Sequence, residues 1–229
     1  MDDQSRLPRP DRDRSLHEVI QDFGASLRPG GPDGEIDEWS VYDETFRRLV
    51  RWAENAGCFF EGFQPLKEGG REHDLIFDSV TLNWLKFTKP AAAGYVVSFD
   101  SHPPSLGPGL PLEYLERLLL QNAIFADTVT FVGIGGERHR PRLITRQADV
   151  PGENASPAEI RELMAVLDFH ELPPAFSLGY DDSLAFARHD AAVFDLRPAN
   201  VVKTADGLIV PIDAIATALD DSSRAALGV

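Results

Sequence analysis

The chain has 229 residues, a hydrophobic fraction of 43% and a formal net charge of −15 at pH 7. This length and apolar content suffice for a packed core in one domain or in a two-lobed unit. The negative charge argues against a general nucleic-acid binder, which needs a basic face, but it is compatible with a local basic pocket for phosphates. Cys58 is the single cysteine, so we expect neither a disulfide framework nor a cysteine zinc site, which fits a reducing cytoplasm.

The N-terminal region predicts a polar tail followed by two helices. Residues 1–14 are charged and contain prolines, so we expect a mobile tail without an apolar signal segment. A first helix is predicted from Ser15, as its N-cap, to about Leu27, and a second from about Val41 to Ala56. No apolar run approaches the roughly 20 residues that span a bilayer, so we expect no membrane contact.

Residues 58–147 are expected to be rich in strands. Turn-prone residues separate the strand candidates from one another, and a helix opened by Pro111 interrupts them. The prolines and glycines of residues 101–110 predict a loop. The expected strands are 58–60, 75–77, 82–87, 95–99, 129–134 and 142–145, and the expected helix is 111–125.

A polar connector at residues 148–156 leads into a smaller mixed segment. Ser156 and Pro157 predict the start of a helix that runs to about Phe169. Short strands are expected near 175–179, 184–187, 192–194, 201–204 and 208–212, followed by a terminal turn or helix at 214–229. Such a connector suits a hinge between lobes, and clefts between lobes are common ligand sites.

The closing strands carry residues suited to phosphoryl transfer. This reaction needs cations at the phosphates and a carboxylate that orients the attacking hydroxyl. Asp195 would accept the hydroxyl proton, and Asn200 and Asp213 would supply the oxygen ligands that magnesium prefers. Arg197 would neutralise Asp195 or bind a phosphate oxygen. Asp206-Gly207, between two apolar runs, predicts only a hairpin turn.

A second cation is available upstream in Lys86, which ends an apolar run and would be aimed to one face of its strand. A buried lysine needs a partner, and the helix at 111–125 offers Glu113 and Glu116 on roughly one side. Lys89 lies close by, and an exposed lysine on a strand is common. The alternative for Lys86 is therefore a solvated surface residue.

The pattern Asp195-Leu196-x-x-x-Asn200, followed by Asp213, resembles the catalytic loop and metal-binding segment of the protein kinase-like fold. Over roughly residues 58–215 the sequence is more closely similar to the compact kinase-like domains of phage and bacterial polyvalent proteins. The motifs that carry this similarity are Gly69-Gly70-x-Glu72-His73, Lys86-x-Thr88-x-Pro90 with Gly94, Tyr114-Leu115-x-Arg117 with Asn122 and Phe125, Asp195-x-Arg197-Pro198-x-Asn200-Val201, and Pro211-Ile212-Asp213.

The resemblance implies an α+β, two-lobed fold. Residues 58–147 would be an N-lobe with an antiparallel sheet and a helix, 148–229 a reduced C-lobe with the catalytic and metal loop, and 1–57 a tail and two helices. It implies ATP and Mg²⁺ as cofactors and an unknown protein or small molecule as the hydroxyl acceptor. The implied nucleotide-binding residues are Lys86, its partner Glu116 in preference to Glu113, Gly69 and Gly70 over the phosphates, and Gln147 and Ala148 at the base.

Departures from the family pattern leave two hypotheses. Val193-Phe194 replaces the usual His-Arg before the catalytic Asp, and Ala214-Ile215 replaces the usual Phe-Gly after the metal Asp. Gly69-Gly70 fits a plain turn as well as a phosphate cradle. The first hypothesis is an ATP-dependent phosphotransferase. The second is a pseudokinase that acts as a nucleotide-binding or protein-interaction module.

Overall fold

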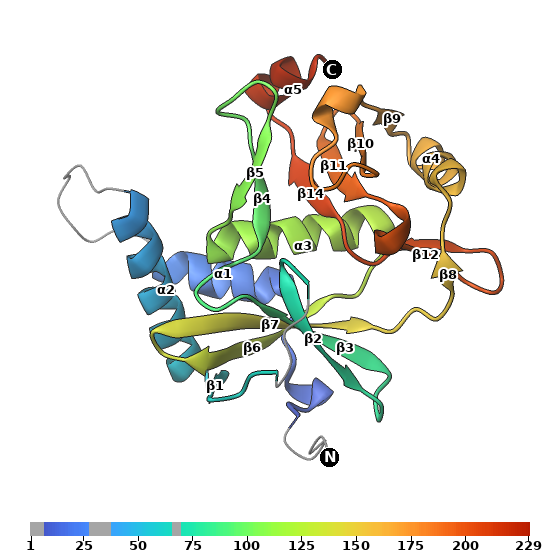
Figure 1. The fold of residues 1–229 in the computed structure, drawn as a ribbon. Helices are drawn as coiled ribbons and strands as arrows, with labels where there is room; N and C mark the ends of the chain where they lie inside the picture. Colours follow the sequence, from blue (N-terminus) through green and yellow to red (C-terminus); the bar gives the residue numbers. More distant parts are fainter. Residues whose placement is uncertain (1–6, 28–37, 66–69) are drawn as a thin grey trace. The chain divides into compact units, whose positions relative to one another are not determined.

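The computed structural model describes residues 7–27, 38–65 and 70–229, and these form a mixed α+β fold (Figure 1). Within this part of the chain the α-helices are α1 (Leu16–Ser26), α2 (Glu38–Asn55), α3 (Pro111–Phe125), α4 (Pro157–Val166) and α5 (Asp221–Leu227). The α1, α2, α3 and α4 helices confirm the predicted helical segments, with α4 ending earlier than expected.

The described residues fall into two compact units that are interleaved along the chain. Unit 1 contains residues 7–27, 38–65, 70–94, 108–119 and 128–149, and unit 2 contains 95–107, 120–127 and 150–229. The passage from unit 1 to unit 2 after Asp149 falls inside the connector that the sequence indicates. The division of the chain into ranges 1–57, 58–147 and 148–229 stays a prediction.

Two helices begin with the capping that the sequence predicts. The Ser15 side chain accepts a hydrogen bond from the Glu18 backbone, and the Glu18 side chain accepts one from the Ser15 backbone. Ser156 and Glu159 repeat this reciprocal arrangement at α4, with Pro157 in the first turn. Each capping box satisfies backbone N–H groups that have no partner within the helix.

Unit 1 is built on a five-stranded sheet with the order β1-β6-β7-β3-β2. The neighbours β6–β7, β7–β3 and β3–β2 are antiparallel, but β1 pairs with β6 in parallel, so the prediction of an antiparallel sheet is wrong at this edge. The chain enters β1 directly after α2 and not through a hairpin, which allows the parallel direction. The strands are β1 (Phe59–Glu61), β2 (His73–Asp78), β3 (Asn83–Thr88), β6 (Thr130–Glu137) and β7 (Arg140–Ala148).

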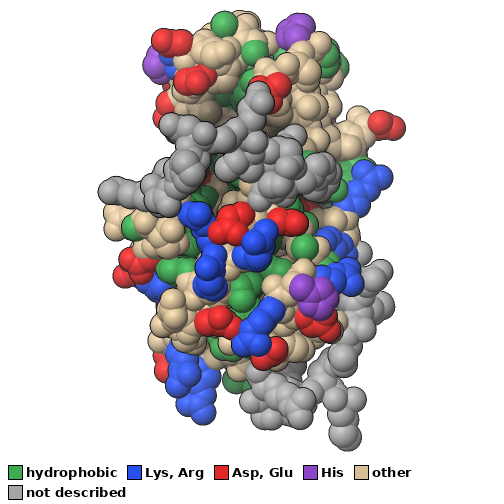
Figure 2. All heavy atoms as spheres, turned by 90° about the vertical axis from the view of Figure 1, so that its left-hand side faces the viewer, with side chains coloured by type: hydrophobic (Ala, Val, Ile, Leu, Met, Phe, Trp, Pro, Cys, Tyr) green, Lys and Arg blue, Asp and Glu red, His purple; other side chains and the backbone are tan. Residues whose placement is uncertain are grey.

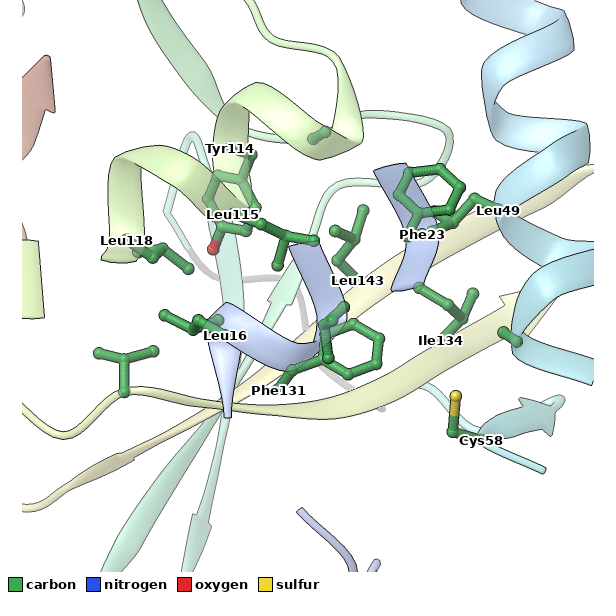
Figure 3. Close-up of a cluster of buried hydrophobic side chains, with 14 of the residues drawn as sticks. Leu16, Phe23, Leu49, Cys58, Tyr114, Leu115, Leu118, Phe131, Ile134 and Leu143 are labelled. Carbon is green, nitrogen blue, oxygen red and sulfur yellow. The ribbon is translucent and has the colours of Figure 1, made fainter. Parts of the chain in front are cut away.

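One face of this sheet is covered by helices. Figure 3 shows the resulting core, in which Leu16 and Phe23 of α1 and Leu115 of α3 lie against Phe131 of β6 and Leu143 of β7. These five side chains are at most 2% exposed, which contributes roughly 1.5–3 kcal/mol for each aliphatic or Phe side chain. The apolar residues of α1 and α3 therefore pack on the same face of the sheet.

Cys58 lies at the margin of the same core (Figure 3). Burial raises the pKa of its thiol to about 11, which keeps it protonated at neutral pH. A buried thiol that stays protonated is a poor nucleophile and a poor metal ligand.

Residues 7–14 do not form a mobile tail, contrary to the prediction for residues 1–14, of which 1–6 lie outside the described residues. Arg14 exchanges backbone hydrogen bonds with Phe131 at 2.8 and 3.0 Å. Arg146, on β7, donates from Nε to Asp13 at 2.6 Å and from Nη2 to the Pro8 carbonyl at 2.6 Å. A buried guanidinium needs acceptors, and this segment supplies them.

Unit 2 contains an antiparallel sheet with the order β14-β11-β10-β9 and a smaller sheet with the order β13-β12-β8. The central strand β11 is buried on both faces, with Val193 in one apolar cluster and Phe194 in another. The strands of the two sheets are β8 (Glu153–Asn154), β9 (His170–Glu171), β10 (Leu184–Ala187), β11 (Ala191–Leu196), β12 (Val201–Lys203), β13 (Ile209–Pro211) and β14 (Ile215–Ala218).

Three local predictions in unit 2 need correction. The strand expected at 175–179 is a 3₁₀ turn at Pro174–Phe176, because consecutive prolines favour a turn. The loop expected at 101–110 contains β5 (Ser105–Pro108), which pairs with β4 (Tyr95–Ser98). The terminal segment forms β14 before α5. The turn at Asp206-Gly207 between β12 and β13 is confirmed, with Gly207 at φ 86°.

The surface around α2 mixes both signs of charge. Glu44 lies 3.0–3.2 Å from nitrogens of Arg47, Arg48 and Arg51. On the face drawn in Figure 2, blue and red side chains are interspersed. None of the helices in the described part of the chain is both long and apolar enough to cross a lipid bilayer.

Candidate active site

The candidate site in unit 2 begins with a bulge at the end of β11. Leu184 lies opposite Leu196 and Phe186 opposite Val193, so β11 carries one extra residue between these pairs. Asp195 lies in this bulge with a left-handed backbone conformation, φ 56°. Aspartate tolerates this conformation better than most residues, and a bulge turns a side chain away from the regular direction of its strand.

Each carboxylate oxygen of Asp195 accepts a hydrogen bond. Ser183 donates from Oγ to Oδ1 at 2.5 Å, and Asn200 donates from Nδ2 to Oδ2 at 3.0 Å. The same Asn200 amide also donates to the Asp195 carbonyl at 2.9 Å. The Asp195 side chain is 16% exposed, so it is largely buried but still reachable.

Asn200 and Asp213 are brought together by the backbone. Asn200 ends a short 3₁₀ turn, Pro198–Asn200, and its carbonyl accepts hydrogen bonds from Ile212 at 2.9 Å and Asp213 at 3.4 Å. The β12–β13 hairpin therefore returns the chain to Asn200. Asp195, Asn200 and Asp213 lie at one edge of unit 2, as the sequence pattern indicated.

The pKa of the Asp195 carboxyl is raised above its ordinary value, mainly by burial. The hydrogen bond from Ser183, the charge of Arg197 and the hydrogen bond from Asn200 lower the pKa in part, whereas the negative charge of Asp213 raises it further. A carboxylate with a raised pKa is a better proton acceptor near neutral pH, provided that it stays ionised.

Arg197 stacks on an aromatic ring and lies at ion-pair distance, but beyond hydrogen-bond distance, from its neighbouring carboxylate. Its guanidinium carbon lies 3.9 Å from the centre of the Tyr180 ring, and Nε is 3.7 Å from Oδ1 of Asp195. That buried Nε has no hydrogen-bond partner among the described residues. A stacked guanidinium with an unused donor is suited to an incoming oxyanion.

The chemistry of the donor set fits magnesium. Asn200 and Asp213 offer an amide oxygen and a carboxylate, and Mg²⁺ prefers oxygen ligands. Asp213 is close enough to Asp195 for its charge to raise the pKa of that carboxyl, and a cation would relieve this repulsion. When bound, magnesium would neutralise phosphate charge at Asn200 and Asp213.

Lys86 belongs to unit 1. It lies on β3, which pairs with β2 on one side and with β7 on the other. It pairs with Leu75 on β2 and with Thr145 on β7, and Thr145 pairs in turn with Phe131. Directly opposed residues share one face of a sheet, and Phe131 packs against α1 and α3. Lys86 is therefore on the α3 side, and it is half-buried.

The other predicted nucleotide-binding residues are also in unit 1, apart from Gly69, which lies outside the described residues. Gln147 is 4% exposed and Ala148 is exposed, both at the end of β7 opposite Trp84 and Asn83. Gly70 is exposed just before β2. Gln147 and Ala148 thus lie at a strand end and Gly70 lies before a strand, as the sequence indicated. Their roles in nucleotide binding stay predictions.

Glu116 lies on the exposed side of α3. Burial and the charge of Glu113 raise the pKa of its carboxyl, and no cation contributes to that shift. Glu113 accepts a hydrogen bond from the Leu110 backbone at 2.7 Å, in a capping role. The pairing of Lys86 with Glu116 therefore stays a prediction without support from this arrangement.

The buried charge pair on α3 is a different one. Arg117, with a side chain 2% exposed, forms an ion pair with Glu72, which is 12% exposed. Beside it, Nε2 of His73 lies 2.7 Å from the Tyr114 hydroxyl. All four residues belong to the motifs that carry the family resemblance, which was the signal that could have identified them as a structural cluster.

Comparison with known proteins supports the kinase-like interpretation. Residues 108–219 match a family model described as a serine/threonine/tyrosine kinase found in polyvalent proteins. No curated protein and no solved structure matches the chain. The matched range includes Asp195, Arg197, Asn200 and Asp213, whereas Lys86 lies outside it.

Proposed function

We propose that this protein is an ATP- and Mg²⁺-dependent phosphotransferase with a hydroxyl acceptor, and the match of residues 108–219 to the kinase family model supports this proposal. The observation that carries the proposal is the convergence of Asp195, Asn200 and Asp213 at one edge of unit 2. The proposal includes a two-lobed arrangement, in which the N-lobe provides Lys86 and the reduced C-lobe provides these three residues.

In this proposal Asp195 receives the proton of the acceptor hydroxyl. Ser183 and Asn200 each occupy one lone pair of its oxygens, and an ionised carboxylate has further acceptor capacity. As the acceptor oxygen bonds to the γ-phosphorus, the bond from that phosphorus to the leaving oxygen of ADP breaks. The proton moves to Asp195.

The remaining residues bind and orient. Arg197, stacked on the Tyr180 ring, binds a phosphate oxygen through its planar guanidinium group. Asn200 and Asp213 hold Mg²⁺. Lys86 holds the phosphates from the α3 side of the sheet in unit 1, and the backbone near Gln147 and Ala148 receives the base.

A nucleotide-binding pseudokinase is the second candidate. It is favoured by the residues that flank the site: Val193 and Phe194 are fully buried core residues, and β14 begins two residues after Asp213. Only a short bend therefore separates the metal residue from the core. This arrangement favours a small acceptor, or none, over a folded protein substrate.

Thermal unfolding with ATP, with and without Mg²⁺, tests the nucleotide site. A ligand at 100 times its Kd stabilises the folded state by about 2.7 kcal/mol, so a metal-dependent rise in Tm is expected for the natural chain. Asp213→Asn should lose that rise because it removes a charged ligand. Asp206→Asn, in the exposed turn of the same hairpin, is the matched control and should retain it.

Two outcomes would contradict the proposal. One is the absence of any metal-dependent rise in the natural chain. The other is an equal rise in Asp213→Asn, which would place the metal elsewhere. Nucleotide binding without phosphate transfer to water, to the protein itself or to a panel of hydroxyl compounds would instead select the pseudokinase.

A further inference from the structure

The loop before β10 contacts Asp195 through a residue that the family pattern does not mark. Ser183 is 2% exposed, and its Oγ lies 2.5 Å from Oδ1 of Asp195. The same oxygen accepts a hydrogen bond from the Tyr180 backbone at 3.0 Å. Since the ionised carboxylate can only accept, the hydroxyl hydrogen points to Asp195, and the Tyr180 N–H fixes the hydroxyl in that orientation.

Ser183 and Asn200 together define the plane of the carboxylate. Ser183, which precedes Asp195 in the chain, donates to Oδ1, and Asn200, which follows it, donates to Oδ2. With one donor alone, the carboxylate could rotate about its terminal torsion, which is broad for aspartate. Two donors on different oxygens remove that freedom.

Gly179 provides an independent observation on the same contact. Its φ is +105°, and a Cβ at this position would overlap Oδ1 of Asp195 and lie 2.9 Å from its Cγ. Only glycine both adopts this conformation without strain and leaves room for the carboxylate. The loop from Gly179 to Ser183 is therefore shaped around Asp195.

We infer that Ser183 is a positioning residue, which holds the Asp195 carboxylate in the orientation that receives the acceptor's proton. The inference rests on the proposed function of Asp195. The hydroxyl reaches this carboxylate from the loop that precedes β10. Buried Val193 and Phe194 occupy the two positions before Asp195 and provide no polar side chain.

The expected kinetic signature is a loss of kcat without a loss of nucleotide binding. Ser183→Ala removes the donor, and a misoriented proton acceptor reduces the rate by roughly 10- to 100-fold. KM for ATP should stay within about twofold, since Ser183 touches no proposed metal or phosphate ligand. Ser183→Thr retains the hydroxyl and should restore most of kcat.

The full-length chain is assayed with ATP and Mg²⁺ by phosphate release and self-phosphorylation. Ser177→Ala is the matched control, since Ser177 lies six residues earlier and its hydroxyl makes no hydrogen bond to the described residues. Thermal unfolding of each variant verifies folding. Equal kcat in Ser183→Ala and the natural chain overturns the inference, as does equal impairment of folded Ser183→Ala and Ser183→Thr.

A measurement that needs no activity separates this inference from the proposed function. The side-chain NH₂ signals of Asn200 in a ¹H–¹⁵N spectrum, assigned by their absence in Asn200→Asp, report on its bond to Asp195. Ser183→Ala should displace or broaden these signals, whereas Ser183→Thr and Ser177→Ala should leave them in place.

The kinetic assay and the NMR spectrum together distinguish a failure of the positioning role from a failure of the phosphotransferase. Displaced Asn200 signals in a chain without phosphate transfer would uphold the orienting contact and contradict the phosphotransferase. Unchanged Asn200 signals, with only the Tyr180 backbone signal displaced, would reduce Ser183 to a turn-forming residue and overturn the inference even in an active enzyme.

Discussion

Two buried carboxylates, Asp78 in unit 1 and Asp195 in unit 2, are held in different ways. Asp78 accepts hydrogen bonds from the Thr81 hydroxyl at 2.6 Å and the Val80 backbone at 3.0 Å, and it lies 3.4 Å from Nη1 of Arg146. Burial raises its pKa, but these bonds and the charge of Arg146 outweigh that effect, and the net pKa is lowered. The ionised form of Asp78 is thus stabilised by the fold.

Asp195 has neutral donors on its oxygens, an arginine beyond hydrogen-bond distance and a second carboxylate nearby, and its pKa is raised. The contrast separates a carboxylate that serves the fold from one that stays reactive. The raised pKa is not sufficient by itself, because burial also raises the pKa of Asp13, which is bonded to Arg146. What distinguishes Asp195 is the convergence of Asn200 and Asp213.

The largest effect is expected from Asp195→Asn. The amide cannot accept the hydroxyl proton, so phosphate transfer should fall by roughly 10²- to 10⁴-fold while the Tm rise with ATP and Mg²⁺ is retained. Phosphate release under saturating ATP provides the measurement. Asp78→Asn, the control from unit 1, should change stability and leave kcat within about twofold. Retained activity in Asp195→Asn would show that Asp195, like Asp78, has no role in phosphate transfer.

The structural side of the comparison is tested by Arg146→Met. Arg146 is 4% exposed and lies between Asp13 and Asp78, so its removal leaves two buried carboxylates without a cation. Such a loss typically costs about 3–5 kcal/mol of the free energy of unfolding, measurable in urea. Adding Asp13→Asn to Arg146→Met should recover part of this loss. Strict additivity of the two changes would show that they do not interact.

A matched pair of arginines sharpens the comparison within unit 2. Arg188 lies 4.6 Å from the Phe169 ring and is bonded to Asp190 at 2.7 Å. Arg197 stacks on Tyr180 and lies 3.7 Å from Asp195, and its Nε donates no hydrogen bond to the part of the chain that the structure describes. Arg197→Lys should weaken ATP·Mg²⁺ binding about tenfold, because lysine lacks the planar fork. Arg188→Lys should change the Kd less than about twofold. Calorimetric titration measures both, and equal effects would assign no ligand role to Arg197.

The smallest effect concerns an exposed carboxylate that caps α4. The hydrogen bond from Lys203, followed by hydrogen bonds from Ser156 and then by the charge of Lys203, lowers the pKa of Glu159 from 4.5 to about 2. A lowered folded-state pKa stabilises the protein above about pH 4.5, and this contribution is lost as the pH falls towards 2. Glu159→Gln should therefore lower Tm at pH 7 slightly and flatten its decline between these pH values. An unchanged decline would contradict the assignment.

The residues of the candidate site differ in how far the sequence predicted them. Asp195, Asn200 and Asp213 were found because strand patterns and the Asp-Gly turn between β12 and β13 constrain their positions. Ser183 was not found, because its contact with Asp195 depends on the β10–β11 pairing and on one extra residue in β11. Nothing in the spacing of 183 and 195 indicates a bulge.

A similar limit applies to charge pairing in unit 1. Helical spacing placed Glu113 and Glu116 on one side of α3, and the structure leaves that side exposed. The buried partner on the helix is Arg117, whose ion pair with Glu72 joins residues 45 positions apart. Periodicity identifies which positions share a face of the helix. It does not identify the polar residue from a distant segment that will contact that face.

The amino-acid sequence alone was enough for the helices, most strands and the order Asp195, Asn200, Asp213, since each depends on local propensity, capping or short-range spacing. The tertiary structure was needed for the docking of residues 7–14, for the parallel β1–β6 pair and for the donors that hold Asp195. The direction of β1 follows from the path of the chain out of α2, whereas the other two features depend on desolvation. A buried arginine or carboxylate takes its partners from whichever distant segment the fold places beside it.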